Sequence, residues 1–122
     1  MAKSYEELVA EAREETEQVD VTEVHEALDS EEDFTILDVR EPGEWQEGHI
    51  PGAKHIPRGV LEYLANDELP EKDTRIVVHC AVGGRGTLAT RTLQEMGYTN
   101  VANMQGGTNA WKEQGYELET GE

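Results

Sequence analysis

Residues 75–97, RIVVHCAVGGRGTLATRTLQEMG, decide the fold. The β-branched run Arg75–His79 is too short for a helix and predicts a buried strand. Residues 86–97 follow with apolar residues at helical spacing and with Gly97 as a helix stop, and Val101–Met104 predicts another strand. Strand, helix and strand in this order predict a parallel pair with a right-handed crossover.

Further short elements surround this unit. The run Phe34–Val39 predicts another buried strand, and helices are expected over about residues 59–66 and 108–114. Short buried strands that alternate with helices are typical of an α/β domain. We therefore expect a central, mostly parallel sheet flanked by helices.

The first third of the chain is strongly acidic, because residues 1–33 carry thirteen acidic and two basic side chains. Apolar residues at helical spacing predict an amphipathic helix over residues 4–18, capped by Ser4, and Asp20 is expected to cap a second helix over residues 21–28. The first helix either docks on the domain or serves as an acidic arm for a basic partner. The expected organisation is a helical extension at 1–19, a main domain at 20–119 and a tail at 120–122.

Composition excludes several classes of function. The 122 residues carry a net charge of -17, which repels nucleic-acid phosphates and anionic lipid surfaces, so we expect no nucleic-acid partner and no membrane partner. The absence of a membrane-spanning apolar run and of a signal-peptide pattern predicts a cytoplasmic protein. No metal site is predicted, because the four histidines lack ligand spacing and Cys80 is the single cysteine.

The residues with candidate chemical roles gather where the predicted strand 75–79 ends. A glycine-rich loop follows, with Cys80 first and Arg85 last, and the helix is expected to begin at once with Gly86. Small residues let backbone N–H groups turn inward, and the helix N-terminus and Arg85 add positive charge, which is typical of an anion cradle. The same charges stabilise a thiolate at Cys80. The alternative is a buried structural cysteine before an ordinary strand-to-helix turn.

Three sequence blocks then point to a family. They are ILDVREPGEW at 36–45 leading into GHIPGA at 48–53, VHCAVGGR at 78–85, and QGGTNAW at 105–111 with Gly115. In this order and at this spacing, the chain resembles single-domain rhodaneses, which are sulfurtransferases, over residues 21–119. The resemblance implies a rhodanese-like α/β domain at 20–119.

The resemblance also implies an activity. Cys80 would be the catalytic nucleophile, which takes a sulfane sulfur from thiosulfate or a similar small anionic donor as a persulfide and passes it to cyanide, to a thiol or to a protein acceptor, without a cofactor. Family members often have serine directly after the loop arginine, so the glycine at that position here predicts modest activity. The residues implied to bind the donor are Ala81, Val82, Gly83, Gly84, Arg85 and Gly86.

Four more residues are expected to support the site. Asp38 and Arg40 lie two residues apart at the end of the strand 34–39, so they share a face and are expected to form a scaffold ion pair. Direct contact of Arg40 with substrate is the alternative. His49 is expected to form a structural hydrogen bond, with general-base work as the alternative, and Arg58 would add a second cation at the pocket rim.

Two other functions remain open at this point. Cell-cycle dual-specificity phosphatases and certain arsenate reductases resemble rhodaneses in fold, but their loops place five residues between Cys and Arg, whereas this chain has four. The shorter loop favours sulfur over a tetrahedral phosphate or arsenate. The third reading is a non-catalytic sulfur-relay or interaction module.

The charge leads to a first prediction, which distinguishes a halophilic protein from an ordinary acidic one. Salt shortens the Debye length from about 10 Å at 0.1 M to about 3 Å at 1 M, so it relieves repulsion among the excess carboxylates. We expect the Tm, measured by circular dichroism, to rise as KCl increases from about 0.1 M to about 2 M. A flat or falling Tm over this range would rule out the halophilic reading.

Overall fold

Five parallel strands form one central sheet in the computed structural model, which describes residues 2–121. The strand order is β1-β5-β4-β2-β3, and every neighbouring pair is parallel. The elements in chain order are α1 Tyr5–Glu15, β1 Glu17–Val19, α2 Val21–Asp29, β2 Thr35–Asp38, α3 Pro42–Glu47, β3 Lys54–His55, the 3-10 turn η1 Arg58–Val60, α4 Leu61–Glu68, β4 Ile76–His79, α5 Gly84–Glu95, β5 Val101–Met104 and α6 Gly107–Glu113. The α/β architecture predicted from the sequence is therefore confirmed.

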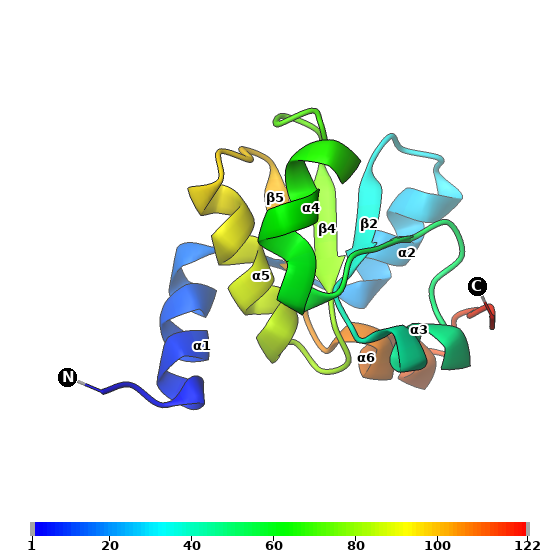
Figure 1. Cartoon of the computed structure of the whole chain (residues 1–122). Coiled ribbons are helices and arrows are strands. Elements are labelled where there is room, and N and C mark those ends of the chain that lie inside the picture. Colours follow the sequence, from blue (N-terminus) through cyan, green and yellow to red (C-terminus); the bar gives the residue numbers. More distant parts are fainter. Residues whose placement is uncertain (1, 122) are drawn as a thin grey trace.

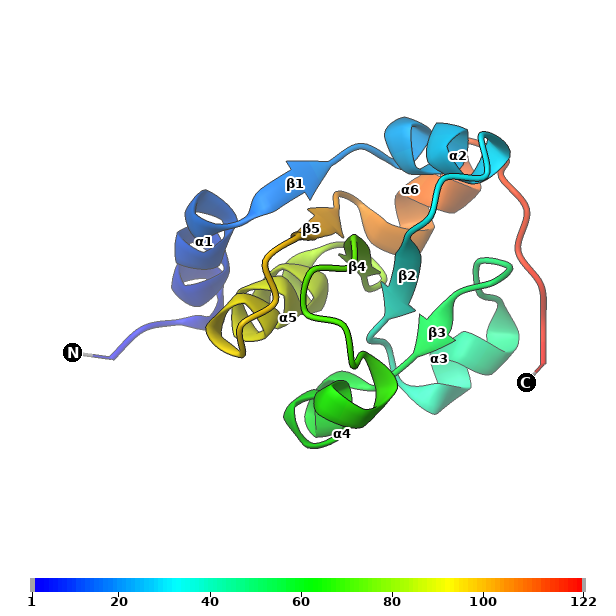
Figure 2. The ribbon, with the colours of Figure 1, turned by 90° about the horizontal axis from the view of Figure 1, so that it is seen from above.

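Helices cover both faces of the sheet. Helices α1, α4 and α5 lie on one face, and α2 and α6 lie on the other (Figures 1 and 2). Adjacent residues of a strand alternate between the two cores: Val77 packs with the α2 and α6 side, and Val78 packs with the α4 and α5 side. A strand that is buried on both faces reads as a continuous apolar run, which is why the central strands were predictable.

The three predicted strands match β2, β4 and β5, but the two edge strands were missed. Strand β1 begins inside the residues expected to form the first helix, 4–18, and that helix instead ends at Glu15. Thr16 has extended backbone angles, and Glu17 then pairs with Ala102 of β5. Pairing with the sheet overrides the helical preference of this segment, so the acidic extension contributes a strand of its own.

Because the strands are parallel, the loops that follow three of them lie at the same edge of the sheet. Strands β2, β4 and β5 end at Asp38, His79 and Met104. The loops that follow them gather at the carboxyl edge of the sheet, along the lower side of Figure 1. No helix among residues 2–121 is long and apolar enough to cross a membrane.

A buried tyrosine, Tyr98, forms hydrogen bonds at the C-terminal end of α4. This contact leads to a second prediction. The Tyr98 hydroxyl is within hydrogen-bond distance of two carbonyl oxygens, those of Ala65 at 3.0 Å and Leu69 at 2.6 Å. Tyr98→Phe removes their donor in a buried site, so we expect the free energy of unfolding in urea to fall by about 1–2 kcal/mol. Tyr63→Phe is the matched control, because Tyr63 is 84% exposed. Equal stability of the two variants would contradict this role.

Candidate active site

The loop after β4 is shorter than the sequence indicated. Helix α5 begins at Gly84, two residues before the predicted start, so Gly84 and Arg85 belong to its first turn. Gly83 is the N-cap and has a φ of 129°, a conformation that side chains disfavour. The loop proper is therefore Cys80–Gly83, and it turns sharply from strand to helix.

The Cys80 thiol points toward this helix terminus. Its side chain is buried, and the backbone N–H of Gly83 donates a hydrogen bond to Sγ over 3.1 Å. The unpaired N–H groups and the dipole of a helix N-terminus stabilise negative charge nearby. The arrangement is suited to a thiolate, or to an anionic sulfur attached to it.

Helix α6 holds the loop from the other side. The backbone N–H and the hydroxyl of Thr108 both donate to the Cys80 carbonyl oxygen, at 2.9 and 3.1 Å, and the Asn109 N–H donates to Ala81 over 3.0 Å. A Cβ at Gly107 would overlap that same Cys80 oxygen. The close approach explains why the block QGGTNAW accompanies the cysteine loop.

Arg85 forms an ion pair with Glu44, a residue that the sequence analysis did not place in the site. Its Nη1 and Nη2 donate to the two carboxylate oxygens of Glu44 on α3, at 2.8 and 3.0 Å. These hydrogen bonds lower the pKa of Glu44 to about 2, and they raise the pKa of Arg85. The pair stays charged at neutral pH. Glu44 belongs to the first motif block, but nothing in its sequence distance from Arg85 indicated that the two side chains are in contact.

The expected ion pair at the end of β2 is present. Arg40 donates to Asp38 through Nε and Nη2, and Nη2 also donates to the Gly48 carbonyl over 2.7 Å. Burial raises the pKa of Asp38, but the hydrogen bonds from Arg40, together with the charges around the carboxylate, leave this pKa below its ordinary value. Both side chains are buried, so the pair fixes the chain between β2 and the loop at Gly48.

A buried histidine precedes the cysteine. Nδ1 of His79 lies 3.1 Å from the Cys80 carbonyl oxygen, so this nitrogen is the donor, and Nε2 has no hydrogen-bond partner among the described residues. Burial lowers the pKa of His79, which keeps the ring neutral. The ring therefore adds no positive charge beside Cys80.

The other two supporting side chains make no hydrogen bond to the cysteine loop within residues 2–121. Nδ1 of His49 donates to the Trp45 carbonyl over 2.9 Å, and its ring stacks on Trp45. Arg58 pairs with Glu62 and donates to Thr92, about two turns along α5 from Arg85. Their contacts thus include Trp45, Glu62 and Thr92, and a structural role for His49 stays our prediction.

The glycine after Arg85 has a structural reason. Gly86 lies inside α5, so a serine at this position would not be the N-cap. A Cβ here would overlap Oδ1 of Asn103, which is buried and has no hydrogen-bond partner among residues 2–121. Asn103 in turn donates to Gln18 of β1 over 2.9 Å. The glycine therefore makes room for a side chain that links the extension to the site.

Metal binding has no support in the geometry. No three His, Cys, Asp or Glu side chains within residues 2–121 come close enough to hold an ion. The absence of a metal or cofactor from the reaction stays a prediction.

Comparisons with known proteins agree with this geometry. A family model for the rhodanese-like domain matches residues 20–114. The chain is 44% identical over 84 residues to the putative sulfur carrier protein YrkF of Bacillus subtilis, covering 69% of this chain and 44% of that protein. It is 32% identical over 94 residues to thiosulfate sulfurtransferase GlpE of Pseudoalteromonas translucida, covering 77% of this chain and 87% of that one.

A solved structure matches nearly the whole chain. It is a protein of unknown function from Rhodopseudomonas palustris, described as a possible tyrosine phosphatase, with a TM-score of 0.90 and 30% identity over 98% of this chain and 96% of that chain. The sequence match at residues 20–114 covers the strands and helices that surround Cys80. The chain belongs to the family of rhodanese-like domains.

Proposed function

We propose that this chain is a sulfurtransferase that takes a sulfane sulfur from thiosulfate, or from a similar small anion, and carries it on Cys80 as a persulfide. The observation that carries the proposal is the hydrogen bond from the Gly83 amide to the Cys80 sulfur at the start of α5. The chain belongs to a family in which one relative is named a thiosulfate sulfurtransferase. The lone thiol suits the reducing cytoplasm, which is the compartment we propose.

The first half-reaction loads the cysteine. The Cys80 thiolate attacks the outer sulfur of thiosulfate, a new S–S bond forms, and the bond between the two thiosulfate sulfurs breaks as sulfite leaves with the electron pair. The Gly83 amide and the first turn of α5 stabilise the negative charge at the sulfur throughout. No base is needed, since the thiolate attacks directly.

Arg85 is proposed to orient the donor. Glu44 holds the guanidinium by two N–H groups, and among residues 2–121 Arg85 makes no other hydrogen bond. Its remaining N–H donors can bind sulfonate oxygens in a fixed direction. Glu44 also offsets part of the charge of Arg85, so we assign Arg85 a role in orientation more than in long-range attraction.

The second half-reaction returns the thiolate. Cyanide or a thiolate attacks the outer sulfur of the Cys80 persulfide, the S–S bond to Sγ breaks, and Cys80 leaves as the thiolate. The loop amides that hold the donor sulfur also stabilise the persulfide, so one anion site serves both halves.

Phosphatase action is the second candidate, because a structural neighbour is described as a possible tyrosine phosphatase. Against it, only four residues separate Cys80 from Arg85, and Gly84 already belongs to α5. A non-enzymatic sulfur carrier is the third candidate, which the name of the Bacillus subtilis relative suggests. That relative is longer, since the chain spans 44% of its length.

Two assays, on the parent and on Cys80→Ser, separate these candidates. Cys80→Ser should abolish thiocyanate formation from thiosulfate and cyanide, because a serine hydroxyl stays protonated without a base. Its circular dichroism spectrum should match that of the parent, since the replacement is close in size. Parent phosphatase activity toward an aryl phosphate should be negligible. Phosphate release that exceeds thiocyanate formation would favour a phosphatase, and a folded parent that shows neither activity would favour a carrier.

Arg85→Lys tests the orienting role. Lysine keeps the charge but cannot hold Glu44 and a sulfonate with a planar fork, so we expect kcat/KM for thiosulfate to fall by about ten- to a hundredfold. Arg75→Lys is the matched control, because Arg75 donates to Glu17 with the same two-point geometry, at 2.9 and 3.0 Å, at the opposite edge of the sheet. Similar losses in both variants, or none in Arg85→Lys, would refute the role.

A further inference from the structure

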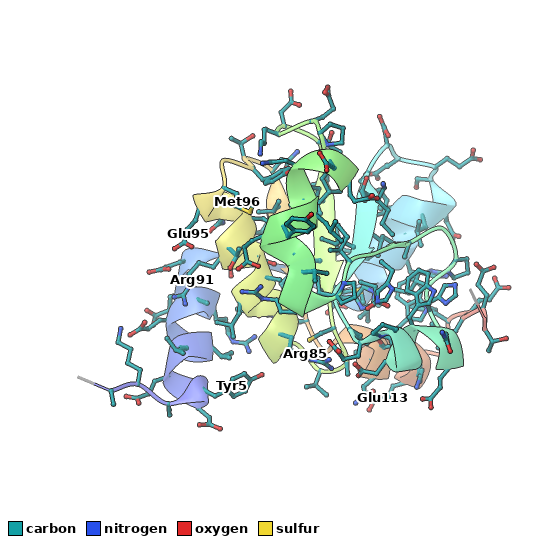
Figure 3. The ribbon with its side chains drawn as sticks, in the orientation of Figure 1. Tyr5, Arg85, Arg91, Glu95, Met96 and Glu113 are labelled. Carbon is teal, nitrogen blue, oxygen red and sulfur yellow. The ribbon has the colours of Figure 1, made fainter. Side chains whose placement is uncertain are left out.

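A cavity of about 300 Å³, which we call the α2 cavity, lies beside α2 at the opposite edge of the sheet from Cys80. Phe34 and Arg75 line it and come directly before β2 and β4, whereas Cys80 comes directly after β4. At about 3.3 Å per residue of a strand, Arg75 and Cys80 are roughly 16 Å apart. In Figure 3, the labelled Arg85 lies near the lower end of α5, and the loop between α2 and β2 lies near the top. The α2 cavity is therefore separate from the candidate active site.

The wall of the α2 cavity is largely apolar. Val24 and Ala27 of α2 line it together with Phe34 and Val77. Val24 and Val77 are almost fully buried and belong to the core on the α2 side of the sheet, so the cavity reaches that core. Small-ligand pockets have volumes of about 300–1,000 Å³, so this one suits a single long side chain or a molecule of similar size.

The rim of the α2 cavity is acidic. Glu23, Glu26 and Glu32 line it, and all three residues are exposed. Glu23 also caps α2, where its carboxylate accepts the Asp20 N–H over 3.2 Å. The side chains of Glu26 and Glu32 form no ion pair and no hydrogen bond within residues 2–121.

Arg75, the cation that lines the α2 cavity among the described residues, is already paired. Its Nη1 and Nη2 donate to the two carboxylate oxygens of Glu17, at 2.9 and 3.0 Å, and Nη1 also donates to Oδ1 of Asn100 over 3.1 Å. Glu26 and Glu32 are thus left without a cation. A ligand that fills the cavity and carries a positive charge at the rim would pair with them.

A lysine or arginine side chain combines the two properties that the α2 cavity favours. Its alkyl stem packs on apolar surface while its charged end stays in water at the rim. Residues 20–33 carry seven acidic side chains and no lysine or arginine, so the acidic surface extends beyond the cavity. A protein segment with several basic residues would use this wider surface as well.

We propose that the α2 cavity binds a basic segment of a partner protein, with one lysine or arginine side chain on the apolar wall and its charge beside Glu26 and Glu32. The inference goes beyond the proposed sulfurtransferase function, and its test needs no sulfur transfer. It assigns the acidic stretch around α2 a role as a docking surface.

Peptide titrations followed by NMR of the isotope-labelled full chain test the α2 cavity. A pentapeptide with one central lysine between alanines should shift the backbone amides of Val24, Ala27 and Phe34 in a saturable way. Norleucine in place of the lysine keeps most of the stem without the charge and should weaken binding about threefold or more. Diaminopropionate keeps the charge on a stem shorter by three methylene groups and should weaken binding about tenfold, because these groups leave the apolar wall.

Matched variants separate the cavity from the general acidity of the chain. Glu26→Gln combined with Glu32→Gln should weaken binding of the lysine peptide about threefold or more. Glu6→Gln combined with Glu14→Gln removes the same charge from exposed positions on α1 and should leave binding nearly unchanged. Ala27→Leu adds bulk to the cavity wall without a change of charge and should remove the saturable shifts. The glutamine variants change exposed side chains, so the test does not depend on Ala27→Leu folding.

Several results would overturn the proposal. Absence of saturable shifts in the parent would do so, as would equal binding of the lysine and diaminopropionate peptides or equal losses in the two glutamine pairs, which indicate general charge attraction. Tighter binding of spermidine than of a peptide with three lysines would assign the cavity to a free amine. Dimerisation in sedimentation that Ala27→Leu abolishes would assign it to a second copy of the chain. Loss of thiocyanate formation bears on the proposed function alone.

Discussion

The hydrogen bond from the Gly83 amide to the Cys80 sulfur depends on a backbone conformation that few residues other than glycine adopt readily. The surrounding structure maintains it from two directions. Strand β4 delivers Cys80 from the buried centre of the sheet, and α6 holds the Cys80 carbonyl through Thr108. The sulfur is therefore held against a helix terminus before any ligand arrives, which is the preorganisation that anion stabilisation requires.

The titratable side chains around this sulfur are either neutral or paired with an opposite charge. His79, the nearest titratable neighbour in sequence, is buried and kept neutral, and Asp38 is held by Arg40. Arg85 is the cation next to the loop, and Glu44 fixes its direction while offsetting its charge. Backbone N–H groups therefore contribute positive potential at the sulfur that cannot be lost by titration.

The central fold and the cysteine loop could be predicted because their signals are local. The apolar runs of β2, β4 and β5 and the glycines after Cys80 each indicate structure within a few residues. Contacts between distant segments gave no such signal. Glu44 meets Arg85 only because α3 folds over the carboxyl edge, and residues 17–19 become a strand only because β5 offers them an edge. The two-residue error at the start of α5 has the same origin, since glycines at 83 and 84 fit either loop or helix.

The extension and the family domain act as one folded unit, because β1 completes the sheet and α1 lies along α5. The central claim nevertheless concerns one atom, the Cys80 sulfur. Intact-protein mass spectrometry after brief exposure to thiosulfate, without reductant, tests it most directly. The account predicts a mass increase of one sulfur atom in the parent and none in Cys80→Ser. A folded parent whose mass does not change would contradict it.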